Sequence, residues 1–129
     1  MVAYPLTEND VKRDTDLIRD LLIKVEENPE MDFTREFPCG SPELDIAGHS
    51  PDELAYHLKM LITEGYLKGN PAVPVVSGLT MAGHDFLGSI RDPGIWNKTK
   101  QRIDGLPGIA LKIVAAIAEA ELKRHLGLS

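Results

Sequence analysis

A helical pattern of apolar residues stands out in the middle of the chain. Its four members recur at intervals of three or four residues, or are adjacent: Leu54, Leu58, Leu61 and Ile62. This spacing places them on one face of a helix. Glu53 follows Ser50 by three residues, as in the capping box that begins many helices. The sequence therefore predicts an amphipathic helix that begins at Pro51 and ends before Gly65, where a glycine can adopt the left-handed conformation.

Comparable patterns predict four further helices and three short strands. The expected helices cover residues 11–27, 81–91, 93–104 and 107–126. Alternation of polar and apolar residues predicts a strand at residues 43–46, and apolar runs predict strands at residues 66–68 and 73–79. Residues 28–49 hold three prolines and two glycines, so no regular helix is expected there.

This order of elements predicts an α+β fold with a winged-helix-like core. The core comprises a helix, a short strand, a helix, a two-stranded wing and a helix, and additional C-terminal helices follow it. We expect a winged-helix-like domain over residues 1–105 and a C-terminal helix over residues 106–129 that packs on it or dimerises. A winged helix that reads DNA usually has a supporting helix before its recognition helix, and the Pro-rich segment leaves no room for one.

Length and composition indicate an ordinary globular protein. The chain has 129 residues, 43% of them hydrophobic and 26% charged, which suits a single domain. It has no run of about 18 apolar residues that could cross a membrane, and its first residues do not resemble a signal peptide. The single cysteine, Cys39, cannot form an internal disulfide. We therefore expect a cytoplasmic protein.

The charge of the chain weakens a nucleic-acid interpretation. The formal net charge is −6, whereas phosphate attraction supplies most non-specific affinity for DNA. Residues 1–50 hold five basic residues against twelve acidic ones. The remaining residues are nearly balanced, so a local basic face remains possible in that half.

The helix after Ser50 and the wing predict a surface for a protein partner. Aromatic residues and methionine are enriched at such interfaces, and no charged residue occurs between Gly69 and Ser77. Packing of the wing valines on the first helix is the alternative explanation for any one of them. The expected contact residues are Tyr56, His57, Lys59, Met60, Thr63, Val73, Val75 and Val76.

DNA binding is the alternative function. The outward face of the helix holds two acids and one lysine, without the Arg, Asn or Gln residues that read bases bidentately. A transcriptional regulator would need four cations on one face, namely Lys59, Lys98, Lys100 and Arg102. We therefore favour a protein partner over DNA.

The last expected helix is apolar nearly all round between residues 109 and 118. A helix of this kind is buried, either in its own domain or against a second subunit. A homodimer would use Ile109, Ile113, Val114 and Ile117.

No residue pattern indicates catalysis, a cofactor or a metal. The four histidines, His49, His57, His84 and His125, lack the paired spacing of zinc ligands. No glycine-rich phosphate-binding loop occurs. We therefore expect a protein that is not an enzyme, with no catalytic residue, no metal site and no cofactor.

Four segments of the chain resemble a family of small phage- and prophage-encoded proteins that carries a domain-of-unknown-function label. They are residues 11–19, 50–67, 78–87 and 90–100. The resemblance covers roughly residues 11–126, and Met81 stands where we would expect an aromatic residue. It implies a winged-helix-like fold and a bacterial or phage genome. It implies no activity and no catalytic residues.

Overall fold

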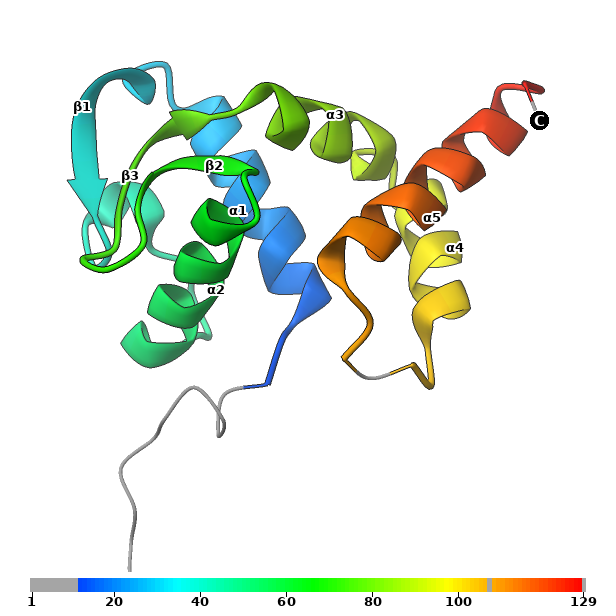
Figure 1. Cartoon of the computed structure of the whole chain (residues 1–129), viewed down its shortest axis with the longest axis horizontal. Helices are drawn as coiled ribbons and strands as arrows, with labels where there is room; N and C mark the ends of the chain where they lie inside the picture. The colour runs from blue at the N-terminus through cyan, green and yellow to red at the C-terminus, as the bar shows by residue number, and fades with distance from the viewer. Residues whose placement is uncertain (1–11, 107, 129) are drawn as a thin grey trace, which may run out of the picture.

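The computed structural model describes residues 12–106 and 108–128. Its elements in chain order are α1 (Thr15–Glu27), β1 (Asp32–Pro38), the 3-10 helix η1 (Pro42–Leu44), α2 (Pro51–Thr63), β2 (Leu67–Asn70), β3 (Val75–Leu79), α3 (Met81–Ile90), α4 (Pro93–Ile103) and α5 (Leu111–His125). The predicted α+β class is confirmed. Figure 1 shows the sheet at one end of the molecule, α4 and α5 at the other, and α1 between them.

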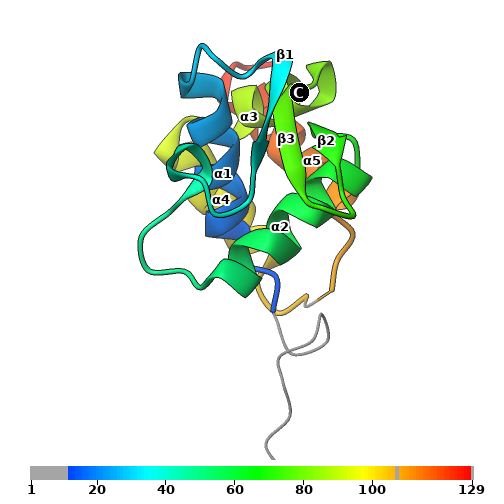
Figure 2. The same ribbon diagram turned by 90° about the vertical axis from the view of Figure 1, so that its left-hand side faces the viewer.

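The three strands form one antiparallel sheet in the order β1-β3-β2. Adjacent strands β2 and β3 form a hairpin in which Leu67 pairs with Leu79 and Asn70 with Val75. Residues 76–79 of the central strand β3 are all buried. Figure 2, seen from the sheet side, shows β1 and β3 in front of α3 and α5.

Helix α1 forms the centre of the core. Its five buried residues are Leu17, Ile18, Leu21, Leu22 and Val25, and they belong to one apolar cluster with residues of the sheet and of every other helix. Arg19 also ties α1 to the end of α3, because its guanidinium donates to the carbonyl groups of Ile90 at 2.9 Å and Arg91 at 2.8 Å. These carbonyls lack helical partners at a C-terminus, so this contact fixes α3 on α1.

The predicted helix signals agree with the observed termini. Ser50 and Glu53 form the expected capping box of α2, and the side chains of Thr80 and Asp92 cap α3 and α4. Gly65 follows the C-cap residue of α2, Glu64, and adopts a φ of 86°, which is the left-handed conformation that a glycine accepts without strain. Local residue chemistry therefore determines where these helices begin and end.

The strand predicted at residues 43–46 is wrong. Residues Pro42–Leu44 form the 3-10 helix η1, in which Leu44 is fully buried and Pro42 occupies the first position. The strand lies earlier, at Asp32–Pro38, where residues 32–36 are all exposed. Its pairing with β3 is irregular between Asp32 and Phe37. An exposed edge strand has no apolar alternation, so the pattern could not reveal it.

The segment before α2 thus holds a single 3-10 turn in place of the supporting helix, as the prolines predict. The expected starts of the first and last helices at Val11 and Pro107 lie outside the described residues. Within the described residues, α5 begins at Leu111. None of the helices in the described ranges has the length and apolar character needed to cross a membrane.

Candidate functional site

A groove of about 1240 Å³ lies on the described surface. The start of α1, one face of α2, the C-terminal half of α4 and the segment between α4 and α5 form its walls. It therefore combines residues from both ends of the chain. We call it the α2–α4 groove.

The lining of the α2–α4 groove is partly apolar and partly basic. Its larger apolar side chains are Met60, Ile103, Leu106 and Ile109. Among the described residues, three cations also line it, Lys12, Arg13 and Lys100, against one acid, Asp104. Lining of this kind suits a ligand with apolar and acidic groups better than a purely polar one.

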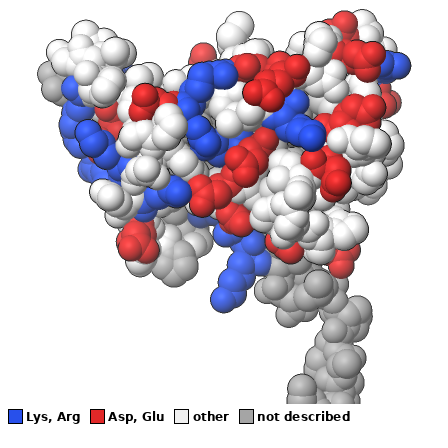
Figure 3. All heavy atoms as spheres, turned by 180° about the vertical axis from the view of Figure 1, so that it is seen from behind, with Lys and Arg blue, Asp and Glu red and all other residues white. Residues whose placement is uncertain are grey.

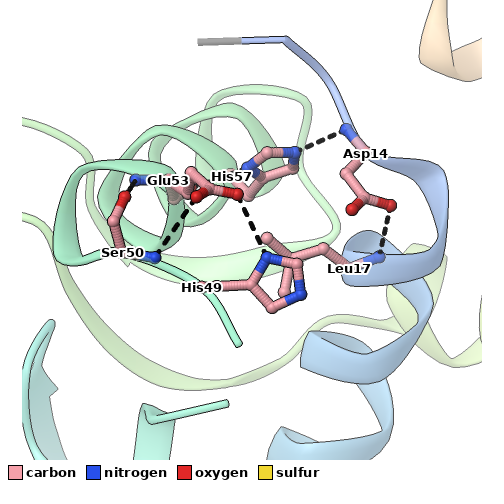
Figure 4. Close-up of polar contacts among 6 residues, drawn as sticks. All are labelled: Asp14, Leu17, His49, Ser50, Glu53 and His57. Atoms are coloured by element: carbon pink, nitrogen blue, oxygen red, sulfur yellow. Dashed lines mark hydrogen bonds and ion pairs between the residues drawn. The ribbon is translucent and has the colours of Figure 1, made fainter. Parts of the chain in front are cut away.

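Helix α2 is held in place at its N-terminus by a small polar network (Figure 4). The Ser50 hydroxyl accepts a hydrogen bond from the Glu53 backbone N–H at 3.2 Å, and the Glu53 carboxylate accepts from the Ser50 backbone N–H at 3.3 Å. The same carboxylate lies 3.1 Å from His49 Nδ1. Hydrogen bonds from His49 and Ser50 lower the pKa of Glu53, which therefore remains ionised at the positive end of the helix dipole.

His57 connects α2 to α1. Its side chain is fully buried, its Nδ1 lies 2.7 Å from the Glu53 carbonyl, and its Nε2 lies 2.8 Å from the Asp14 backbone nitrogen. A carbonyl can only accept and a backbone N–H can only donate, so Nδ1 carries the proton and the imidazole is neutral. Burial is the main reason that the pKa of His57 is lowered. Figure 4 shows the imidazole directed at the backbone just before α1.

Asp16 connects the same first turn of α1 to α4. Its carboxylate accepts hydrogen bonds from the Trp96 indole N–H at 2.7 Å and from Lys100 Nζ at 2.9 Å. Burial opposes ionisation of Asp16, but these two donors outweigh it and lower the pKa of the carboxyl group. Both helical walls of the groove, α2 and α4, are thus attached to the first turn of α1.

The structure separates the residues predicted on α2. Tyr56 and Met60 are half-buried and line the α2–α4 groove, whereas Lys59 and Thr63 are exposed outside its lining. The assignment of His57 to the surface is wrong, because its side chain is fully buried. His57 lies three residues after Leu54 and one before Leu58, inside the apolar stripe, which is the signal that could have revealed its burial.

The wing residues also differ from one another. Val73 is 62% exposed and Val75 is half-buried, so both remain accessible. Val76 is fully buried, and its prediction as a partner contact is therefore wrong. The reason is that Val76 belongs to the apolar core cluster that includes the buried residues of α1.

The residues predicted for dimerisation lie in different environments. Ile113 is 50% exposed, Ile117 is half-buried, and Ile109 lines the α2–α4 groove. Val114 is fully buried in the core of its own chain, so it cannot contact a second subunit. It lies on the inner stripe of α5, three residues after Leu111.

Two of the four cations considered for a DNA surface, Lys100 and Arg102, form ion pairs within the chain. Lys100 binds Asp16 in α1, whereas Arg102 donates to Glu121 in α5 at 2.9 Å. These two of the three cations of α4 therefore contact different helices. Hydrogen bonding from Arg102 is the main cause of the lowered pKa of Glu121, so this pair joins α4 to α5.

Sequence reasoning missed the basic part of the groove. Lys12 and Arg13 precede α1, and Lys100 lies far along the chain in α4. No local pattern could bring them together, because their proximity depends on the packing of α4 beside α1. Within residues 12–106 and 108–128, no group of three or more His, Cys, Asp or Glu side chains could hold a metal ion.

Residues 12–110 match the family described as hypothetical protein DUF2513. The chain belongs to this family. It is also similar to an uncharacterized protein of Haemophilus influenzae, with 30% identity over 99 residues, which is 72% of this chain and 79% of the relative. No solved structure matches the chain. All groove residues named above lie within the range that the DUF2513 family covers.

Proposed function

We propose that this DUF2513 protein is a non-enzymatic binding protein that holds a segment of a partner protein in the α2–α4 groove. The main support is the combination of size and lining. The groove volume of about 1240 Å³ exceeds the roughly 300–1,000 Å³ of clefts that hold drug-sized molecules. Tyr56 and Met60 lie in it, and both residue types are enriched at protein interfaces.

The distribution of charge supports a protein partner over DNA. Figure 3 shows acidic and basic side chains interspersed over the face seen from behind, without an unbroken basic surface. Lys68 on β2 lies over the Phe33 ring at 6.0 Å, and the turn after it carries no further cation. A DNA-binding wing would offer cations to phosphates at this position.

The order of elements supports a winged-helix relationship as part of the proposal. Strand β1 lies beside β3, and the β2–β3 hairpin follows α2, which is the arrangement expected for a recognition helix with its wing. In this protein the winged-helix-like core would serve as a scaffold on which a partner protein docks. A phage or prophage origin and a cytoplasmic location belong to the same proposal, supported by the sequence resemblance and by the unpaired thiol of Cys39.

Site-specific photo-crosslinking tests the proposed function. A crosslinking side chain at Gln101, which lines the groove, should capture one defined protein in the native cell. The matched control carries the same group at the exposed Ala72, in the turn between β2 and β3. Capture at Ala72 alone would contradict the groove and favour the wing.

A double substitution, Tyr56→Ala with Met60→Ala, should abolish capture from Gln101 and leave the protein folded. Both side chains are only half-buried, so we expect the variant to fold, and circular dichroism checks this. Retained capture by this folded variant would argue against the site.

A homodimer remains a separate proposal, supported by the exposed Ile113. Sedimentation equilibrium tests it, and a monomer mass at all concentrations would remove it.

A further inference from the structure

We infer that the partner segment bound by the α2–α4 groove is acidic on one side and apolar on the other. This inference rests on the proposed function and specifies the chemistry of the partner. It follows from the placement of the cations and of the apolar side chains that line the groove.

The groove is basic although the protein is acidic. The chain has a formal net charge of −6, yet three of the four charged side chains among the described lining residues are cations. Lys100 shares its charge with Asp16. Lys12 and Arg13 make no ion pair with any other described residue. Such a local excess of positive charge among the described lining residues attracts an anionic partner and repels a basic one.

The apolar lining requires more than charge from the partner. Met60 from α2, Ile103 from α4, and Leu106 and Ile109 from the connecting segment line the groove together. Leu106 is 52% exposed, so it has apolar area to bury against a ligand. Amphipathic helices bind such grooves through apolar residues at helical spacing. An acidic helix with one apolar face would satisfy both parts of the lining.

A nucleic acid fits the lining less well. Strands of nucleic acid are held by cations that follow the phosphates and by aromatic side chains that stack on bases. Tyr56 is the one aromatic residue among those that line the described groove, and the apolar side chains would face phosphate or solvent. The observations therefore favour a peptide.

Selection of peptides from a random display library on the immobilised full chain tests the inference. The expected peptides have an excess of Asp and Glu over Lys and Arg, with apolar residues spaced by three or four. Fluorescence anisotropy then measures their affinity for the wild type and for the double variant Lys12→Glu, Arg13→Glu. Affinity should fall at least tenfold in this variant.

The matched control is the double variant Lys98→Glu, Lys123→Glu. It changes the net charge equally on exposed side chains that do not line the groove, so affinity should stay within about twofold. Circular dichroism and melting temperature establish that both variants fold.

The outcomes distinguish the inference from the proposed function. Groove-dependent peptides without an acidic excess would overturn the inference and keep the proposed function. If the selection yields no peptide whose binding depends on Tyr56 and Met60, both the inference and the proposed function are overturned. Binding of a 30-base duplex or single-stranded DNA that is lost in the Lys12→Glu, Arg13→Glu variant, without peptide binding, would replace the peptide with a nucleic acid.

Discussion

A single hydrogen bond between His57 and Asp14 joins helix α2 to the N-cap of α1. The Asp14 backbone N–H donates to His57 Nε2 at 2.8 Å, and the Asp14 side chain in turn caps α1 by accepting from the Leu17 backbone N–H at 3.2 Å. Asp14 thus caps the N-terminus of α1 with its side chain and binds α2 through its backbone N–H. A proton on Nε2 would remove the acceptor, because a charged imidazole is a donor at both nitrogens.

The first prediction is a loss of stability below neutral pH that depends on His57. Burial lowers the pKa of His57 in the folded chain from its ordinary 6.5, so the unfolded chain binds the proton at higher pH. The contribution is fully present above about pH 6.5 and is lost as the pH falls from there towards the lower folded pKa. The maximal slope is about 1.4 kcal/mol per pH unit. Urea unfolding at pH 7.5, 6.5 and 5.5 measures it.

The variant His57→Gln should be less stable at pH 7.5 and should lose much of this pH dependence. His84→Gln is the matched control, because His84 is exposed on α3, and it should retain the wild-type slope. The groups that face His57, namely Asp14, Glu53 and His49, stay unchanged in both variants. Equal slopes for the wild type and His57→Gln would contradict a role for the imidazole.

The second prediction concerns the hydrogen bonds that Asp16 of α1 accepts from Trp96 and Lys100 of α4. Trp96→Phe removes the indole N–H that donates to Asp16 and leaves most of the buried ring area, so we expect a loss of about 1–3 kcal/mol. Lys100→Met should cost less, at most about 1 kcal/mol, because its ion pair with Asp16 is partly exposed. Double-mutant cycles with Asp16→Ala measure both couplings. A larger coupling to Asp16 for Lys100 than for Trp96 would show that the ion pair, and not the indole hydrogen bond, is the stronger link between α1 and α4.

The third prediction tests the buried face of α2. Leu58 is fully buried, so Leu58→Ala should destabilise the protein by about 2–5 kcal/mol through lost apolar contact and a residual cavity. Val73→Ala removes apolar atoms from a side chain that is 62% exposed, and its effect should stay within about 0.5 kcal/mol. Urea denaturation of the two variants provides the comparison. Similar losses for both would contradict the burial that the structure shows.

The elements with local signals were predictable, and the contacts between distant segments were not. Ser50, Thr80 and Asp92 identified three helix starts because capping depends on residues within one turn. Strand β1 escaped prediction because its residues 32–36 are exposed.

The lining of the α2–α4 groove was likewise predictable only where one helix supplies it. Tyr56 and Met60 were predicted from the outward face of one helix, but Arg13 and Lys100 meet in one lining only after α4 packs beside α1. Periodicity reports which face of an element is apolar. It does not report which cations of two remote elements share a surface.

The last prediction compares two glycines of α3. A Cβ at Gly83 would lie 2.1 Å from the Tyr66 carbonyl oxygen and 2.5 Å from a Leu79 methyl carbon, whereas a Cβ at Gly88 would meet nothing within 4 Å. Gly83→Ala therefore forces α3 away from the hairpin and should cost about 1–3 kcal/mol or more. Gly88→Ala replaces a glycine in an exposed helix position and should stabilise the protein by up to about 1 kcal/mol. Thermal and urea unfolding of the two variants should give changes of opposite sign. A stabilised Gly83→Ala variant would mean that α3 does not pack against the start of β2 as closely as the structure shows.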